Sequence, residues 1–519
     1  MSILPSIAEA LLNSQAYPHK PRKIELVQTQ MSFLFLTGDY VYKVKKPVNL
    51  GYLDYTTLEK RRFFCHQELE LNRRLCPEVY LAVAPIVEYK GALHIEGEGK
   101  TVEYAVKMKQ LPRDHMMDVL LPRGQVSQEM VTKVAEKLVS FHQRAETNPE
   151  IAAFGKLGVI RQNTDENFAQ TERYVGVSIP STEYNRIENY TDDFMQSNAS
   201  LFNKRIREGK IRDCHGDLHA AHVCFTDDIC IYDCIEFNDR FRYSDVASEI
   251  AFLAMDLDRY QQADLSNHLV NTYVELSHDE ELLKLLNFYK CYRAYVRGKV
   301  ESFKLDDPYL TEEEKKASLA TAESYFDLAC SYARAKPLVI ITTGLVGTGK
   351  TTVAEALSQR LGCATISSDV IRKKLANISP TEHRFEEFQG GIYSADFSAK
   401  TYSEMFQQAD KILSQGQSVI LDATFGRKED RLQAKKLAEE RGADFVVLEC
   451  LLDEENTKRR LEERLKGETT SDGRWEIFEF QKQRFDPVTE IAPQQHVVLD
   501  TSQPIDNIIE IIRSRLCSG

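Results

Sequence analysis

The sequence has very little tryptophan and no long uncharged stretch. Only one of its 519 residues is Trp, and no uncharged run reaches the roughly 20 residues that a bilayer-spanning helix needs. The first twenty residues also lack a basic start followed by a long apolar segment, which is the pattern of a secretory signal. These absences predict a cytoplasmic protein without a membrane partner.

Cysteine pairs with metal-binding spacing are also absent. The chain has 11 cysteines, and none are spaced C-x-x-C, so a zinc site is not expected. In a reducing cytosol these thiols are expected to be small, unpaired core residues.

The chain has no Lys/Arg-rich tract and no low-complexity segment or internal repeat. Its 66 basic and 79 acidic residues give a formal net charge of -13, which counts against binding to nucleic acid or acidic membranes. A small hydroxylated or phosphorylated substrate fits this charge better. At this length a single core is not expected, and the chain should form about two or three domains.

What the sequence does have is a phosphate-binding motif. Residues 344–351 match the pattern G-x-x-x-x-G-K-[ST] after the apolar run 338–341 and before a predicted helix, 352–361. Glycines let the backbone amides curve around phosphate oxygens, Lys350 adds a positive charge, and the Thr351 hydroxyl is a ligand for Mg²⁺. ATP and Mg²⁺ are therefore the expected cofactors. The residues predicted to bind the nucleotide are Gly344, Gly347, Thr348, Gly349, Lys350, Thr351 and Thr352.

Two carboxylates follow strands in the same half of the chain. Asp422 ends the predicted strand 418–421 and is expected to hold Mg²⁺ beside the phosphate loop. Asp369 follows the strand 364–367 and is a candidate general base, with Arg372 one helical turn later to clamp the substrate or the transferred phosphoryl group. The alternatives are local: either Asp caps a turn or helix, and Arg372 is a solvated surface residue.

Arg460 and Arg464 are spaced to share one helix face, just before the polar, turn-rich segment 466–474. This arrangement is typical of a closing lid whose arginines neutralise charge on the moving phosphoryl group. An ordinary charged surface helix is an equal alternative, because Glu462 and Glu463 lie between them.

A second phosphoryl-transfer signature lies in the other half. His215-Gly216-Asp217 and, later, Ile231-Tyr232-Asp233 match an arrangement in which one Asp accepts a hydroxyl proton and another holds Mg²⁺. Upstream, a predicted hairpin of strands 32–36 and 40–44 places a Lys on a central strand, and the helix 56–75 carries a Glu to face it. Lys45 is the alternative to Lys43, and Glu70 to Glu68, because the sequence alone leaves the register open.

The expected fold class combines two architectures. Residues 1–335 predict an α+β, kinase-like, two-lobed domain, with a small lobe at about 20–110 and a helical large lobe at about 111–335. In the large lobe, helices are expected at 127–144, 191–207, 244–259, 266–275, 280–303 and 311–335. Asp245 is expected to cap one of them. Residues 336–519 predict a three-layer α/β P-loop NTPase domain with a parallel sheet, because strands and helices alternate.

Residues 337–519 resemble the small P-loop kinases, a group that includes gluconate kinases, antibiotic phosphotransferases of that fold, polynucleotide kinases and zeta-type toxins. The resemblance rests on the series G-x-x-G-x-G-K-T-T, S-S-D-x-I-R, L-D-A-T and R-L-x-x-R. It implies an AAA-type ATP-binding kinase in which Asp369 activates a substrate hydroxyl and the lid arginines, Arg460 and Arg464, contact phosphates.

Residues 20–330 resemble the aminoglycoside phosphotransferase family, a branch of the protein-kinase-like fold. The resemblance implies that Lys43 and Glu68 orient the nucleotide phosphates, that Asp217 accepts the hydroxyl proton and that Asp233 holds Mg²⁺. The family usually has Asn five positions after the catalytic Asp, as a second metal ligand, but His222 stands there in this chain. Imidazole is a poor ligand for Mg²⁺.

The His222 substitution leaves three outcomes open: a one-metal kinase, an altered metal preference, or a nucleotide-binding domain with little catalysis. A transition-metal site at His219 and His222 lacks an apparent third ligand in the sequence. The leading expectation is a bifunctional phosphotransferase acting on small hydroxylated molecules. The alternatives are an ATP-responsive regulator with a weak N-terminal domain, and a nucleic-acid end kinase, which the acidic balance disfavours.

Overall fold

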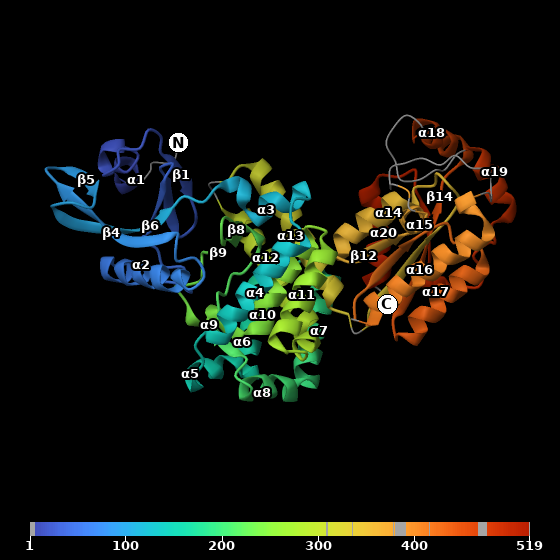
Figure 1. Cartoon of the computed structure of the whole chain (residues 1–519), viewed down its shortest axis with the longest axis horizontal. Helices are drawn as coiled ribbons and strands as arrows, with labels where there is room; N and C mark the ends of the chain where they lie inside the picture. Colours follow the sequence, from blue (N-terminus) through green and yellow to red (C-terminus); the bar gives the residue numbers. More distant parts are fainter. Residues whose placement is uncertain are drawn as a thin grey trace. The chain divides into compact units, whose positions relative to one another are not determined.

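A computed structural model describes residues 6–307, 310–334, 336–376, 378, 391–414, 416–464 and 475–517. The chain divides into two compact units, whose elements are labelled in Figure 1. The first unit comprises Met1–Ile179 and Thr191–Tyr332, and the second comprises Pro180–Tyr190 and Ala333–Gly519. Among the described residues, no helix is both long enough and apolar enough to cross a bilayer.

The first unit contains a six-stranded antiparallel sheet with the order β1-β2-β3-β6-β4-β5. Its strands are β1 (Glu25–Gln28), β2 (Ser32–Leu36), β3 (Tyr40–Lys45), β4 (Tyr80–Tyr89), β5 (Ala92–Ile95) and β6 (Lys100–Lys109). The predicted hairpin is confirmed, because β2 and β3 pair antiparallel with Leu34 opposite Lys43. Since β3 also pairs with β6, Lys43 lies on a central strand of the sheet.

One long helix, α2 (Leu58–Arg73), packs on this sheet against β4 and β6. The Thr57 side chain caps its start by accepting a hydrogen bond from the Lys60 amide. Glu68 and Leu69 lie on the buried face, whereas Glu70 is exposed. A helix turns by about 100° per residue, so positions two apart point in nearly opposite directions and only one of these glutamates can face the sheet.

The rest of the first unit is mainly helical, and four of its helices form one apolar core. These four are α4 (Gln128–Arg144), α10 (Val246–Arg259), α11 (Ala263–Ser277) and α12 (Leu282–Phe303). The other helices are α1 (Ser6–Ala10), α3 (Met117–Leu120), α5 (Pro149–Ala152), α6 (Leu157–Thr171), α7 (Ser181–Ser197), α8 (Ala199–Arg207), α9 (Asp239–Arg242) and α13 (Glu312–Tyr332). Hydrophobic periodicity did not predict α6, because three of its four buried residues are polar, namely Thr164, Asn167 and Thr171.

Two short antiparallel pairs complete this unit. They are β7 (Ile211–Asp213) with β10 (Tyr243–Asp245), and β8 (Val223–Phe225) with β9 (Ile229–Ile231). The segment between β7 and β8 carries Asp217, and Asp233 is the second residue after β9. This topology brings two polar stretches that are separate in the sequence to neighbouring strand ends.

The second unit is built on a five-stranded parallel sheet with the order β12-β13-β11-β14-β15. Its strands are β11 (Leu338–Thr343), β12 (Ala364–Ser367), β13 (Val419–Asp422), β14 (Asp444–Leu451) and β15 (His496–Asp500). Its helices are α14 (Lys350–Leu361), α15 (Ser368–Leu375), α16 (Ala395–Ser414), α17 (Lys428–Glu440), α18 (Glu454–Arg464), α19 (Trp475–Arg484) and α20 (Ile505–Cys517). The predicted parallel α/β domain is therefore confirmed.

Alternate residues of β11 show why the second unit has three layers. Leu338 and Ile340 belong to the core formed with α14 and α20, whereas Val339 and Ile341 belong to the core formed with α16 and α17. Both faces of the strand are buried, so it reads as a continuous apolar run in the sequence.

The first residues of α7 group with the second unit, although the sequence placed them in the N-terminal domain. Arg186 of α7 donates hydrogen bonds to the carbonyls of Ala333 (3.1 Å) and Leu516 (3.0 Å), and Glu183 forms an ion pair with Arg513 of α20. These partners lie more than a hundred residues away in the sequence, so local pattern gave no sign of the grouping.

Cys76 and Cys230 form a disulfide, with their Cα atoms 4.8 Å apart. The expectation that every cysteine is unpaired is therefore wrong for these two. They are 154 residues apart, and only the folded chain brings the end of α2 to β9. The other cysteines whose side chains are described are buried.

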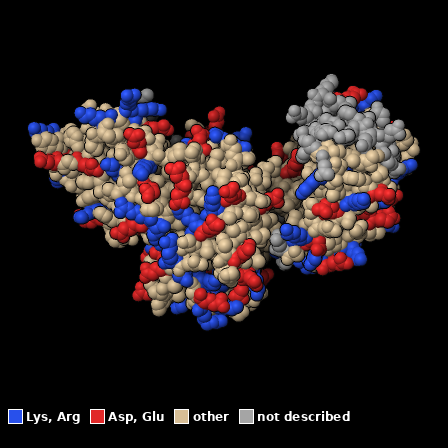
Figure 2. All heavy atoms as spheres, viewed as in Figure 1, with Lys and Arg blue, Asp and Glu red and all other residues tan. Residues whose placement is uncertain are grey.

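Figure 2 shows acidic and basic side chains interspersed over the visible face of both units. On this face the charges of the two signs are mixed rather than gathered in one place.

Candidate functional sites

The phosphate loop connects β11 to α14, as the motif predicts. Gly349 is the N-cap of α14 with φ 85°, and Gly344 has φ 136°. A Cβ at Gly344 would lie 2.5 Å from the carbonyl oxygen of Cys450, so both backbone conformation and space require glycine there. The loop thus presents its backbone at the amino end of a helix, where amides and the helix dipole favour an anion.

We expect the Gly344→Ala variant to lose at least about tenfold in ATP affinity, because the loop must move away from Cys450 to admit the methyl group. Calorimetric titration with ATP measures this loss. Gly442→Ala is the matched control, since Gly442 also has positive φ (63°) but has nothing within 4 Å of its would-be Cβ. Equal ATP affinities for the two variants would contradict the steric argument.

Asp422 and Thr351 are hydrogen-bonded side by side next to this loop. The Thr351 hydroxyl donates to Asp422 Oδ2 at 2.8 Å, and the Thr342 hydroxyl donates to Oδ1 at 3.0 Å. Asp422 is buried at the end of β13. It does not cap the next helix, because α17 starts only at Lys428. A carboxylate and a hydroxyl in contact are suited to holding Mg²⁺ together.

Lys350 bends back over the loop, where its ammonium group donates to the Leu345 carbonyl at 2.7 Å. The amide of Val346 donates to Gln481 Oε1 of α19 at 2.9 Å. An apolar cluster of Val346, Leu461 and Phe478 packs the loop against α18 and α19. Gln481 is a site residue that the sequence did not reveal, because no motif links it to a loop 135 residues earlier.

Arg460 lies at the other end of the loop. It donates to the Thr501 carbonyl at 2.7 Å, and a Cβ at Gly349 would lie 3.1 Å from its Nη1 atom. The Thr501 hydroxyl in turn donates to the Thr348 carbonyl at 2.7 Å. Arg464 is the last residue of α18; its side chain and the predicted lid, 466–474, lie outside the described residues.

Asp369 and Arg372 both lie on α15, which starts immediately after β12. Ser367 pairs in register with Asp422, so the half-buried Asp369 is at the same edge of the sheet as the predicted Mg²⁺ ligand. Arg372 is buried. It donates to the Ile392 carbonyl at 2.7 Å and to the Ser398 hydroxyl at 3.1 Å, so in this structure it anchors the segment before α16.

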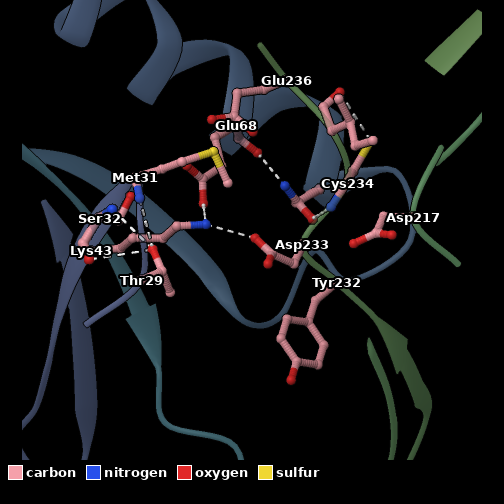
Figure 3. A network of polar contacts seen from close by, with 12 residues as sticks. Thr29, Met31, Ser32, Lys43, Glu68, Asp217, Tyr232, Asp233, Cys234 and Glu236 are labelled. Atoms are coloured by element: carbon pink, nitrogen blue, oxygen red, sulfur yellow. Dashed lines mark hydrogen bonds and ion pairs between the residues drawn. The ribbon is translucent and has the colours of Figure 1, made fainter. Parts of the chain in front are cut away.

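In the first unit the structure brings together Lys43, Glu68 and Asp233, as Figure 3 shows. The Lys43 ammonium lies 2.8 Å from Glu68 Oε1 and 2.6 Å from Asp233 Oδ1. Lys45 is fully buried between Glu68 and Glu236, and Glu70 is exposed. Of the alternatives that the sequence left open, Lys43 and Glu68 are therefore the pair that reaches Asp233.

The electrostatics of this group favour its charged forms. Burial alone would lower the pKa of Lys43, but Asp233 and Glu68 outweigh it and raise that pKa well above its usual value. Burial would raise the pKa of Asp233, yet Lys43 and His222 hold it below the ordinary carboxyl range. Lys43 and Asp233 are therefore both charged at neutral pH.

Asp233 is held in place by its backbone as well as by Lys43. It has φ 63°, a left-handed conformation that Asp tolerates better than most residues. Its amide donates to the Tyr80 hydroxyl at 3.2 Å, and the next amide, that of Cys234, donates to Asn72 Oδ1 at 2.9 Å. Residues of β4 and α2 thus fix the turn after β9.

Asp217 lies beyond Asp233 as seen from Lys43 (Figure 3). His219 Nε2 and His222 Nδ1 are each 3.6 Å from Asp217 Oδ2. Burial would raise the pKa of Asp217, but His219 and His222 outweigh it, so the pKa lies far below the usual range. The side chain is about one-third exposed (33%), so an ionised carboxylate is open to an incoming hydroxyl group.

His222 occupies the position where the family usually has Asn. Its Nδ1 donates to the Asp217 carbonyl at 2.8 Å, and its Nε2 is 3.6 Å from Asp233 Oδ2. Burial, and then the neighbouring His219, lower the pKa of His222 to about 4. The ring is therefore neutral at physiological pH.

A buried carboxylate on α10 braces the loop that carries Asp217. Glu249 Oε1 accepts the amides of His215 (2.7 Å) and Gly216 (2.9 Å), and its Oε2 is 2.7 Å from His142 Nε2. Sequence reasoning missed Glu249, since it reads as one polar residue in an apolar helix. Asp245, predicted as a cap, does accept the Ala247 amide at the start of α10.

We expect Glu249→Gln to lower the free energy of unfolding of the first unit by about 3 kcal/mol at pH 7. The reason is that the buried His142 side chain and the loop amides lose the negative charge that they contact in the wild type. Burial would raise the pKa of Glu249, but His142 and the loop amides lower it from 4.5 to about 2. The native state thus binds fewer protons than the unfolded chain between these values, so the stabilisation is present above pH 4.5 and is lost as pH falls towards 2.

Urea unfolding followed by circular dichroism at pH 7, 5 and 3 measures this effect. The difference between wild type and Glu249→Gln should shrink as the pH falls, whereas the exposed Glu275→Gln control on α11 should match wild type throughout. A difference that does not depend on pH would show that the charge of Glu249 is not its source.

Comparisons with known proteins cover both units. The AAA domain family matches residues 339–488. The uncharacterized protein Rv2004c of Mycobacterium tuberculosis (strain H37Rv) is 31% identical over 429 residues, which is 82% of this chain and 83% of that protein. The uncharacterized protein Mb2027c of Mycobacterium bovis matches with the same identity and coverage.

Two solved structures are similar over a smaller part of the chain. A gluconokinase from Sinorhizobium meliloti 1021 is 18% identical, with a TM-score of 0.26, over 36% of this chain and 94% of its own. The APS kinase CysC of Mycobacterium tuberculosis, in complex with AMPPNP and APS, is 19% identical, with a TM-score of 0.27, over 35% of this chain and 98% of its own.

The mycobacterial relatives span both units of this chain, and the AAA match covers the phosphate loop, Asp369 and Asp422. At this identity and coverage, the chain belongs to the same family as the uncharacterized mycobacterial proteins Rv2004c and Mb2027c, and its residues 339–488 form an AAA-type P-loop domain.

Proposed function

We propose that the chain is a bifunctional ATP-dependent phosphotransferase. The second unit transfers the γ-phosphoryl group of ATP to a hydroxyl of a small molecule. The first unit is a second small-molecule kinase of the aminoglycoside phosphotransferase-like type. The observation that supports the assignment of the second unit is the hydrogen bond between Thr351 and Asp422 beside the glycine loop, because a hydroxyl and a carboxylate in contact are the ligands that a nucleotide-bound cation needs.

In the second unit, the loop amides and the α14 amino terminus bind the phosphates, and Lys350 places a positive charge beside the outer ones. Thr351 and Asp422 are the residues that would hold Mg²⁺, which would supply positive charge to neutralise the phosphates. Asp369, at the same edge of the sheet, orients the acceptor hydroxyl and takes its proton as the new O–P bond forms, while the bond from the γ-phosphorus to the oxygen of the leaving ADP breaks.

In the first unit, Lys43 is held by Glu68 and directed towards Asp233, a geometry suited to binding the phosphates of a nucleotide. Asp217 is ionised and accessible, so it accepts a hydrogen bond from the acceptor hydroxyl and then its proton. The low pKa of Asp217 makes it a weak base. Its main contribution is therefore to orient the hydroxyl towards the phosphoryl group.

The proposal is tested by incubating the full-length protein with ATP labelled at the γ-phosphate and a pool of small polar metabolites. We expect two groups of labelled products. One group should disappear in Lys350→Ala and the other in Asp217→Asn. Absence of any labelled product, together with no calorimetric affinity for ATP, would overturn the proposal. Labelling that depends only on Lys350 would reduce the first unit to an ATP-binding regulator.

A further inference from the structure

Four side chains with metal-ligating atoms, those of Asp217, His219, His222 and Asp233, gather in the first unit. The ligand atoms of Asp217, His219 and His222 lie within 4.8 Å of one another. Asp233 joins them from the other side of His222, with its Oδ2 atom 3.6 Å from His222 Nε2. The sequence suggested the two histidines but offered no third ligand, and the folded chain supplies two carboxylates.

The separations match ligands that share an ion better than groups bonded to one another. Two pairs, His219 Nε2 with Asp217 Oδ2 and His222 Nε2 with Asp233 Oδ2, are each 3.6 Å apart, which is too long for a hydrogen bond. Bonds of about 2.1 Å from a metal place neighbouring ligand atoms roughly 3.0 to 3.4 Å apart. A contraction of a few tenths of an ångström would therefore bring each pair into one coordination shell.

The orientation of His222 is that of a prepared metal ligand. Its Nδ1–H donates to the Asp217 carbonyl at 2.8 Å, so the lone pair is on Nε2, the atom that faces Asp233. Metal-binding histidines are typically oriented in this way, with the second ring nitrogen donating to a carbonyl or carboxylate. Lys43 occupies Oδ1 of Asp233, whereas the atom facing the histidine is the other oxygen, Oδ2.

The ligand atoms of these side chains, imidazole nitrogens and carboxylate oxygens, determine which class of metal ion they bind best. Mg²⁺ is a hard ion that takes oxygen ligands and keeps several waters. Imidazole nitrogen suits the later first-row divalent ions, and a mixed set of nitrogen and carboxylate ligands binds them more strongly along the series from Mn²⁺ to Cu²⁺. Replacing an amide oxygen by an imidazole at position 222 therefore shifts the preference away from Mg²⁺.

We propose that the first unit has a binding site for a divalent first-row transition ion, formed by Asp233 and His222 with Asp217 and His219 beside them. The inference deepens the proposed kinase function of this unit, because the ion sits between the nucleotide-binding lysine and the carboxylate that receives the acceptor. Its test measures metal binding directly and does not depend on turnover.

Co²⁺ is the probe, because its visible absorption reports nitrogen and oxygen ligands. The full chain is freed of metal with a chelator and titrated with Co²⁺ without nucleotide. We expect saturation at one Co²⁺ per chain and no displacement by a large excess of Mg²⁺. In His222→Asn, Co²⁺ affinity should fall at least about tenfold, since even outer-shell changes cost about 10- to 100-fold, and Mg²⁺ should compete.

The control is His66→Asn, because His66 is exposed on α2, far from the ligand set in sequence, and this variant should bind Co²⁺ as wild type does. His222→Gln serves as a second variant, and circular dichroism verifies that each protein is folded. Failure of wild type to bind Co²⁺, or unchanged affinity in both folded His222 variants, overturns the site. Co²⁺ binding without phosphoryl transfer would support the site while refuting the proposed kinase activity of this unit.

Discussion

Replacing Lys350 by alanine is expected to lower phosphoryl transfer by the second unit by about 10²- to 10³-fold. The ammonium group lies within the loop itself, 2.7 Å from the Leu345 carbonyl, so it can move onto a phosphate without rearrangement of the backbone. Removing one such preorganised charge costs roughly 3 to 4 kcal/mol of transition-state stabilisation. Single-turnover transfer from labelled ATP to the products assigned to this unit measures the loss.

Lys436→Ala is the matched control for Lys350→Ala. Lys436 is exposed on α17 and forms a surface ion pair with Glu440, which contributes little to stability. This variant should keep wild-type transfer and wild-type ATP affinity. If Lys350→Ala kept more than about a tenth of the activity, the phosphate loop would not be the source of catalysis in the second unit.

The site of the second unit was largely predictable because its parts are contiguous in the sequence. Strand, loop, Lys350, Thr351 and helix follow one another within about 20 residues, and local geometry determines their arrangement. The placement of Asp422 at the loop was also predictable, since parallel strands end at a common edge. Gln481 was not, because its contact with Val346 depends on how α19 packs over the loop.

Two choices between neighbouring residues in the first unit differ in whether the sequence alone could decide them. The choice of Glu68 over Glu70 was available in the sequence, because Cys65, Leu69 and Asn72 share one face with Glu68 at helical spacing. The choice of Lys43 over Lys45 was not. Both lysines point to the same side of β3 and both contact Glu68, so only tertiary packing decides which of them reaches Asp233.

Two other features required the folded chain. Arg372 was expected to contact substrate, and in this structure it is buried against Ile392 and Ser398; a role on the phosphoryl group stays a prediction. The loop of Asp217 is braced by Glu249, 32 residues later in an apolar helix. A buried charge within an apolar run is a signal that sequence reasoning should have used, because such charges are rare without a partner.

Replacing Asp217 by asparagine is expected to lower phosphoryl transfer by the first unit by about 10²- to 10⁴-fold, because the variant loses the negative charge that orients the acceptor hydroxyl and then takes its proton. Asparagine keeps the size of the side chain but cannot take the acceptor proton. Transfer by the second unit should be unchanged, and the Asp217→Asn, Lys350→Ala double variant should lose both activities. Product-resolved assays with labelled ATP separate the two contributions.

The decisive comparison is with Asp227→Asn, an exposed carboxylate in the turn between β8 and β9, which should behave as wild type. If Asp217→Asn also leaves every product unchanged while Lys43→Ala still weakens ATP binding, the first unit binds the nucleotide without transferring phosphate. The His222 substitution would then be a feature of a unit that senses ATP and has lost catalysis. If instead the Asp217-dependent products appear only when Mn²⁺ or Co²⁺ replaces Mg²⁺, the metal ion bound by the His222 imidazole is the one that the first unit uses in phosphoryl transfer.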